Sequence, residues 1–129
     1  MPVEFVFWDR SLQNRRYKLF LDFDFYKPPL NIFKPEEALE VVKMECERLR
    51  RLFPKIGRYT LMRSLGGAMA LFDGELTQEE LFNVLAQSYF VDRGFRHYAF
   101  EKGGIQCLRM SPKVVVGGKR VVEPAPWEV

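Results

Sequence analysis

Residues 17–26 of the chain read YKLFLDFDFY, and this stretch decides the fold. Most of its residues are apolar or aromatic, which is typical of a strand buried on both faces near the middle of a sheet. Side chains alternate along a strand, so Asp22 and Asp24 point to one face, and their apolar neighbours Leu21, Phe23 and Phe25 point to the other. The two carboxylates lie about 7 Å apart at strand spacing and repel each other. Either a divalent metal ion lies between them, or both lie at a wet strand end beside Arg and Lys side chains.

Length and composition predict one packed domain. The chain has 129 residues, of which 47% are hydrophobic and 15% aromatic, and this is enough for a core of its own. We expect a single domain over residues 1–129, with a core at 17–113 and a C-terminal hairpin and tail at 114–129. The formal net charge of +3 is mild and by itself indicates no polyanionic partner.

The sequence also indicates where the protein resides. Cys46 and Cys107 lack metal-ligand spacing, and two cysteines do not make a disulfide scaffold, so we expect buried thiols in a reducing compartment. The N-terminus lacks the pattern of a signal peptide. No stretch approaches 18 uncharged apolar residues, so we expect no membrane segment. The predicted location is intracellular, in the cytoplasm.

Turn and cap signals divide the chain into elements. A helix is expected to start at Pro35 and to end before Pro54, and a second helix begins at the capping box formed by residues 77–80. Two glycines in the segment SLGG, residues 64–67, favour a tight hairpin turn. The expected strands are 3–8, 17–26, 58–63, 68–72, 97–100 and 105–110, with a closing hairpin of 114–116 and 121–122.

From the opening strand onward, these elements follow the order strand, helix, strand, strand, helix, strand. That order predicts an α+β, split βαβ (ferredoxin-like) fold: an antiparallel sheet with both helices on one face and extra strands at the termini. The opening strand is then central in the sheet. Leu21 and Phe23 meet the helices, while Phe20, Asp22 and Asp24 lie on the open face.

Three clusters of basic residues and serines near turns and strand ends are candidates to share that face. They are Arg63 and Ser64 at the hairpin turn, Arg109, Ser111 and Lys113 at alternate positions, and Lys119 and Arg120 in the last turn. Together they could hold a phosphate chain, with Asp22 and Asp24 holding its Mg²⁺ or Mn²⁺ ions. Alternatively these basic residues are merely solvated, and for Lys119 and Arg120 this second interpretation is favoured.

Two further titratable residues suit structural roles better than chemical ones. His97 has no Cys or His partner at ligand spacing, so a structural role in a strand is expected. Asp92 opens a glycine turn after an apolar run; it could supply a third carboxylate, but its position favours a cap or turn.

The strand LFLDFD (19–24), the hairpin RSLGGAM (63–69) and the segment LRMSPK (108–113) together resemble motifs of the archaeo-eukaryotic primase and primase-polymerase superfamily. That resemblance implies a catalytic core on an RRM-like unit, with Asp22 and Asp24 as ligands of divalent metal ions. It further implies that Arg63, Ser64, Arg109, Ser111 and Lys113 contact phosphate or nucleic acid. The resemblance covers roughly residues 17–113.

The chain departs from the family pattern at the hairpin, where Met69 stands in place of a histidine. The third acid is not identified, and the chain is short for a full primase. The resemblance therefore implies a primase-like domain that binds metal-nucleotide or nucleic acid and is either degenerate or active with a partner. The alternative is a non-catalytic ferredoxin-like module that binds nucleic acid or assembles with a protein partner or a second copy.

Overall fold

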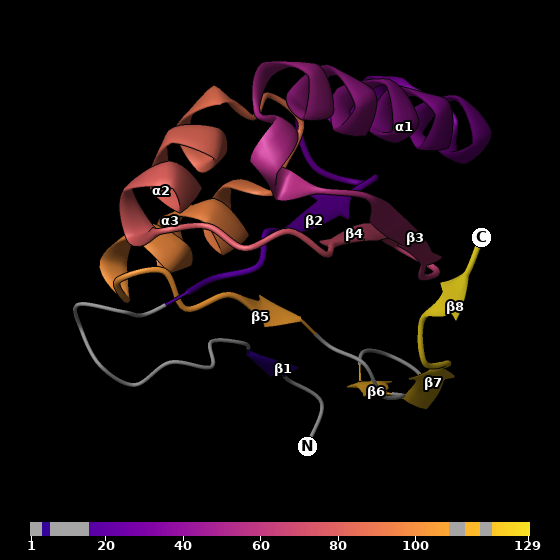
Figure 1. Ribbon diagram of the computed structural model, residues 1–129. Helices are drawn as coiled ribbons and strands as arrows, with labels where there is room; N and C mark the ends of the chain where they lie inside the picture. The colour runs from indigo at the N-terminus through magenta and orange to yellow at the C-terminus, as the bar shows by residue number, and fades with distance from the viewer. Residues whose placement is uncertain (1–3, 6–15, 109–112, 117–119) are drawn as a thin grey trace.

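The computed structural model describes residues 4–5, 16–108, 113–116 and 120–129 of the chain. The architecture is α+β, as predicted, and the described residues form three α-helices and a four-stranded antiparallel sheet, compatible with a small split βαβ fold (Figure 1). The elements are β1 Glu4–Phe5, β2 Phe20–Asp24, α1 Pro35–Leu52, β3 Tyr59–Arg63, β4 Gly67–Phe72, α2 Gln78–Gln87, α3 Arg93–Glu101, β5 Cys107–Leu108, β6 Lys113–Val116, β7 Arg120–Glu123 and β8 Trp127–Glu128.

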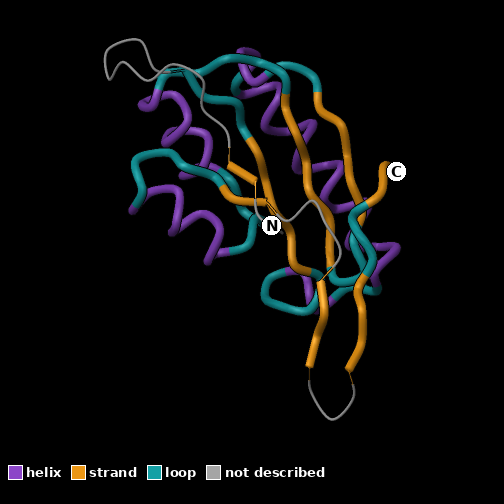
Figure 2. Tube along the Cα trace, turned by 90° about the horizontal axis from the view of Figure 1, so that it is seen from below, coloured by secondary structure: helices purple, strands orange, loops and turns teal. Residues whose placement is uncertain are grey.

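The four-stranded sheet has the order β2-β4-β3-β8. The expected hairpin joins β3 to β4, and the Ser64 N–H donates to the Gly67 carbonyl across its turn at 2.9 Å. The predicted C-terminal hairpin is also present, as β6 and β7, and it extends away from the sheet (Figure 2). The tail beyond it returns to pair β8 with the outer edge of β3, where Trp127 lies opposite Arg63.

The two predicted helices begin where their cap residues indicate. At α1 the Lys34 N–H donates to the Glu37 carboxylate at 3.0 Å, and the helix ends before Pro54. At α2 the Thr77 hydroxyl accepts from the Glu80 N–H, and the Glu80 carboxylate accepts from the Thr77 N–H, which completes the capping box. α1 runs along one face of the sheet, whereas α2 and α3 lie on the β2 side (Figures 1 and 2).

The strand expected at 97–100 is wrong, because this segment belongs to helix α3. Asp92 caps the helix by accepting the Phe95 N–H at 3.0 Å. Gly94 then falls in the first turn, where backbone N–H groups have no intrahelical partner, so it does not break the helix. Phe95 and Ala99, four residues apart, bury one face of the helix.

The expected place of the opening strand is also wrong. Within the described chain the short β5 pairs with β1, so β2 lies at an edge of the sheet with β4 as its strand neighbour. A side chain fills the empty side: the buried Gln106 amide accepts from the Phe20 N–H at 2.8 Å and donates to the Lys18 carbonyl at 2.5 Å. Gln106 thus takes the place of a strand neighbour at the start of β2.

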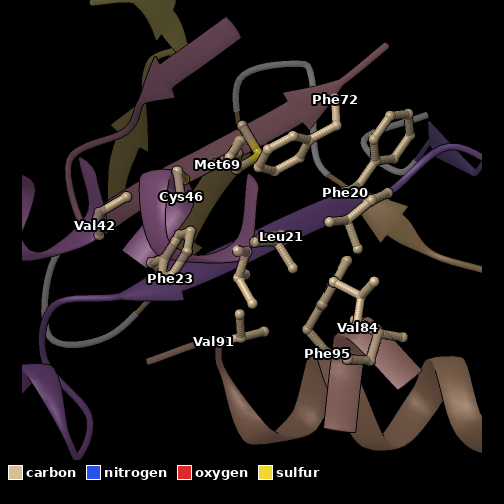
Figure 3. Close-up of a cluster of buried hydrophobic side chains, with 14 of the residues drawn as sticks. Phe20, Leu21, Phe23, Val42, Cys46, Met69, Phe72, Val84, Val91 and Phe95 are labelled. Carbon is tan, nitrogen blue, oxygen red and sulfur yellow. The ribbon is translucent and has the colours of Figure 1, made fainter. Parts of the chain in front are cut away.

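The core packs against the three apolar residues of β2, which are Phe20, Leu21 and Phe23. Figure 3 shows residues of β2 and β4 packed with Val42 and Cys46 of α1 and with Val84 and Phe95 of α2 and α3. Cys46 is a free, fully buried thiol whose pKa burial raises to about 12, so it is unreactive. Among the described residues, no helix is both long and apolar enough to cross a membrane.

Candidate functional site

Asp22 and Asp24 lie on the sheet face opposite α1, as side-chain alternation predicts. Both residues are partly exposed, whereas Leu21 and Phe23 of the same strand are at most 1% exposed. Asp22 lies opposite Met69 of β4, and Asp24 lies opposite Gly67. The acids are therefore held by a paired strand and not by a free loop, so their positions are fixed by the sheet. Phe20, expected on this open face, is in fact buried.

A hollow of about 530 Å³ lies over these two acids. Its volume is within the range of small-molecule sites. Its walls come from the end of β2, the β3–β4 turn and the segment before β8; they are Asp22, Phe23, Asp24, Tyr26, Lys27, Ser64, Gly66, Gly67, Met69 and Pro126. The opening strand and the glycine hairpin, which the sequence singles out separately, thus meet at one place.

Gly67 brings the hairpin against the acidic strand. A Cβ atom at Gly67 would lie 1.9 Å from the Phe23 carbonyl oxygen, so any side chain there would push β4 away from β2. Gly66 differs, because a Cβ atom there would be 3.9 Å from the Tyr26 ring, an ordinary contact. Close backbone approach at Gly67 therefore fixes one wall of the hollow beside Asp24.

A third carboxylate and a lysine lie next to this pair. The Lys27 ammonium lies 3.8 Å from the Asp24 carboxylate and 3.9 Å from the Asp92 carboxylate. Asp92 is attached to β2 by its backbone, since its N–H donates to the Asp22 carbonyl at 2.7 Å. Asp92 thus has the cap role that its position favours, and it also lies among the acids.

The pKa of Asp22 shows the electrostatic character of the site. The pKa of Asp22 is raised from 3.8 to about 7, chiefly by burial of the carboxyl group and in addition by the negative charges of Asp92 and Asp24. Lys27 and a backbone N–H lower it, but by less. The site therefore has an excess of negative charge that one lysine does not balance.

The other predicted site residues divide into three groups. Ser64 lines the hollow, as expected. Arg63 does not join the acids, because it lies on the opposite face of the sheet with its guanidinium 5.4 Å from the centre of the Phe25 ring. Lys113 begins β6 opposite Glu123, and Arg109 and Ser111 lie outside the described residues.

The two carboxylates supply oxygen ligands of the kind that a divalent ion such as Mg²⁺ prefers. The Lys27 ammonium group lies close to both Asp24 and Asp92. The carboxylates of the site therefore attract positive charge. In residues 16–108 and the other described segments, no three His, Cys, Asp or Glu side chains are arranged as a complete metal cage. Mg²⁺ in nucleotide sites is held by one or two carboxylates together with substrate phosphates and water, which suits Asp22 and Asp24.

Sequence reasoning missed three residues that line the hollow, Tyr26, Lys27 and Pro126. A signal exists for Tyr26 and Lys27, because they closely follow the two acids and precede the two prolines that end the strand. Sequence reasoning placed His97 in a strand, but it lies exposed on α3, 3.5 Å from Glu101.

The fold and the site define a small α+β domain with an acidic hollow on the open face of its sheet. Comparison of the chain with models of known protein families, with curated proteins and with solved structures finds no match. The resemblance to primase-like proteins therefore stays a prediction, and function has to be argued from the site.

Proposed function

We propose that the hollow over Asp22 and Asp24 binds a divalent metal ion together with a nucleotide or a nucleic acid, as in a primase-polymerase-like domain. The observation that carries this proposal is the meeting of the two acids with the Ser64–Gly67 hairpin turn around one hollow of about 530 Å³. Two carboxylates on one strand can provide part of the coordination shell of Mg²⁺ or Mn²⁺, and phosphate oxygens and water complete such a shell.

Electrostatics make the two ligands depend on each other. Three aspartates surround one lysine here, so a bare phosphate chain is repelled. A divalent ion at Asp22 and Asp24 would supply the positive charge that a phosphate chain needs. The Ser64 hydroxyl, which lines the hollow, is available in the same space as a donor to a phosphate oxygen.

The proposal concerns binding and does not extend to turnover. Met69 forms part of the hollow at the position where the family pattern has histidine. A thioether carries no charge and is only a weak hydrogen-bond acceptor, so it cannot hold a phosphate as an imidazolium would. Nucleotidyl transfer would therefore require another group, from this chain or from a partner protein.

The test is a titration of Mn²⁺ with and without a nucleoside triphosphate, followed by calorimetry and by thermal unfolding. We expect the wild type to bind the metal-nucleotide complex and the double variant Asp22→Asn/Asp24→Asn to lose this binding. The matched control is Glu75→Gln/Glu79→Gln, which removes the same charge from exposed positions away from the hollow. If the wild type shows no response to Mn²⁺ in either condition, the proposal is wrong.

A second candidate function, a module for protein assembly, is favoured by one observation. A groove of about 630 Å³ lies between α1 and the segment before α3, with Met44 69% exposed and Tyr89 72% exposed at its sides. Exposed apolar side chains of this size are typical of contact surfaces. Sedimentation of the wild type and of Met44→Glu separates this candidate from the first, because nucleotide binding should not change in that variant.

A further inference from the structure

Tyr26 carries an aromatic side chain that is 70% exposed, on a backbone that is held in place by hydrogen bonds. Its N–H donates to the Asp24 carboxylate at 2.9 Å, which closes a turn directly after β2. The preceding residue, Phe25, is only 3% exposed and donates its N–H to the Gly66 carbonyl at 2.9 Å. The backbone that carries the Tyr26 ring is therefore anchored on both the acidic strand and the hairpin.

This anchoring places the Tyr26 ring at the wall of the hollow. A Cβ atom at Gly66 would lie 3.9 Å from the ring, so the ring lies over the glycine turn. Pro126 and Met69 add apolar surface to the same hollow, whereas Asp22, Asp24 and Ser64 supply polar groups. An apolar wall beside a few convergent polar groups is the composition of a site for a ligand with one flat apolar part and one charged part.

We propose that Tyr26 is the stacking platform for the base of the nucleotide, and that it gives the hollow its preference for nucleotides over bare phosphate chains. The inference rests on the proposed function, because the phosphates are held at the metal ion on Asp22 and Asp24. A planar base is the part of a nucleotide that an exposed aromatic ring recognises, and stacking accepts any base because every base has a π-face. Tyr26 is thus a specificity-determining residue of the site.

The anchoring of Tyr26 favours this role over that of an ordinary surface ring. The Asp24 carboxylate accepts the Tyr26 N–H with one oxygen and faces Lys27 with the other, so the backbone that carries the ring is joined to the acid. A backbone held in this way has little conformational entropy to lose when a base stacks on the ring. The backbone distance between Tyr26 and the two acids is set by the fold before a ligand arrives.

The experiment compares two Mn²⁺-bound ligands, a nucleoside triphosphate and inorganic tripolyphosphate, by calorimetry. We expect the wild type to bind the nucleotide about fivefold or more tightly than tripolyphosphate, since stacking contributes about 1–3 kcal/mol per base. Tyr26→Ala should lose this difference and keep its affinity for tripolyphosphate, and Tyr26→Phe should retain it. The control Tyr89→Ala removes an equally exposed ring that lies on Arg48 instead, and it should leave both affinities unchanged.

The outcomes separate the two proposals. If the wild type binds neither ligand in the presence of Mn²⁺, the proposed function fails and the role of Tyr26 fails with it. If both ligands bind but Tyr26→Ala leaves the affinity for the nucleotide unchanged, only the stacking role is overturned. Equal weakening of both ligands by Tyr26→Ala would also overturn it, because the ring would then act on the phosphate end or on the fold of the turn.

Discussion

The backbone N–H of Asp92 donates a 2.7 Å hydrogen bond to the carbonyl oxygen of Asp22. This bond joins the segment between α2 and α3 to the outer edge of β2, and it brings a third carboxylate next to the two on the strand. Asp92 has a structural reason to be there, since its side chain caps α3. The same position makes its charge the second largest cause, after burial, of the raised pKa of Asp22. A helix cap thus also sets the electrostatics of the candidate site.

The raised pKa of Asp22 makes stability depend on pH. The folded-state pKa is about 7 and the ordinary value is 3.8, so between these values the folded protein binds the proton that the unfolded chain has released. Stability from this group is therefore present at low pH and is lost as the pH rises from about 4 to 7, with an upper limit of about 1.4 kcal/mol per pH unit.

We expect the variant Asp22→Asn to be more stable than the wild type at pH 8 and close to it at pH 4.5. Urea unfolding across this range measures the difference in free energy, and Glu75→Gln, at an exposed position, serves as the control. A difference between Asp22→Asn and the wild type that does not change with pH contradicts the assignment.

Replacement of Lys27 should shift the pKa of Asp22 upward. The ammonium group lies between Asp24 and Asp92, and it is one of the two influences that lower the pKa of Asp22. In Lys27→Gln that influence is removed while burial and the two acids remain, so the pKa should rise above that of the wild type. Carboxyl-carbon NMR of Asp22 measures it directly in metal-free protein.

The matched control for this prediction is Lys43→Gln, which removes a lysine paired with Glu40 on α1. It should leave the titration of Asp22 unchanged. Because the Lys27 side chain is 66% exposed, its ion pairs should add less than about 1 kcal/mol to stability. A fall in the pKa of Asp22 in Lys27→Gln would show that the lysine acts through the shape of the turn and not through its charge.

Adjacent glycines of the hairpin should respond very differently to alanine. At Gly67 the new Cβ atom would lie 1.9 Å from the Phe23 carbonyl oxygen, a backbone atom that can move only if β2 and β4 separate. Gly67→Ala should therefore cost about 3 kcal/mol of stability or more. Gly66→Ala meets only an ordinary contact and should stay within about 1 kcal/mol of the wild type, as denaturant unfolding would show. Equal losses in the two variants would mean that close approach at Gly67 does not hold the strands together.

Short-range signals in the sequence were enough to predict the strand and the hairpin that carry the site. Alternation placed Asp22 and Asp24 on one face, and the glycine pair located the hairpin that meets them, because both signals depend on neighbouring residues alone. The interpretation failed at α3, where the sequence predicts a glycine turn followed by a strand, whereas Asp92 caps a helix. Cap and turn residues are the same residue types, so the sequence does not separate the two outcomes there.

Contacts between residues far apart in the chain could not be predicted from the sequence for another reason. Glu45 lies on the apolar face of α1, 2% exposed, where it accepts from Arg48 at 2.7 Å and from the Tyr89 N–H at 2.5 Å. Glu45 lies three residues after Val42 and four before Leu49, so the sequence indicates an acid on the buried face of the helix. Its partner Tyr89 is 44 residues away, and no neighbouring residue indicates that pairing. Arg63 points away from the acids because of the register in which β3 pairs with β4. That register is likewise a property of the fold and not of the neighbouring residues.

Gln106 provides the clearest test of how the edge of β2 is held. Its side chain hydrogen-bonds the Phe20 N–H and the Lys18 carbonyl on the edge that no strand covers among the described residues. In Gln106→Leu the buried Phe20 N–H loses this acceptor, so we expect a loss of about 1–3 kcal/mol, the cost of one unsatisfied group. Gln106→Glu, when ionised, can still accept from Phe20 but cannot donate to Lys18, and burial of its charge adds a cost that low pH should relieve. Amide hydrogen exchange at Phe20 reads out the edge itself: exchange should accelerate in Gln106→Leu, whereas unchanged protection there would show that packing alone closes this side of the sheet.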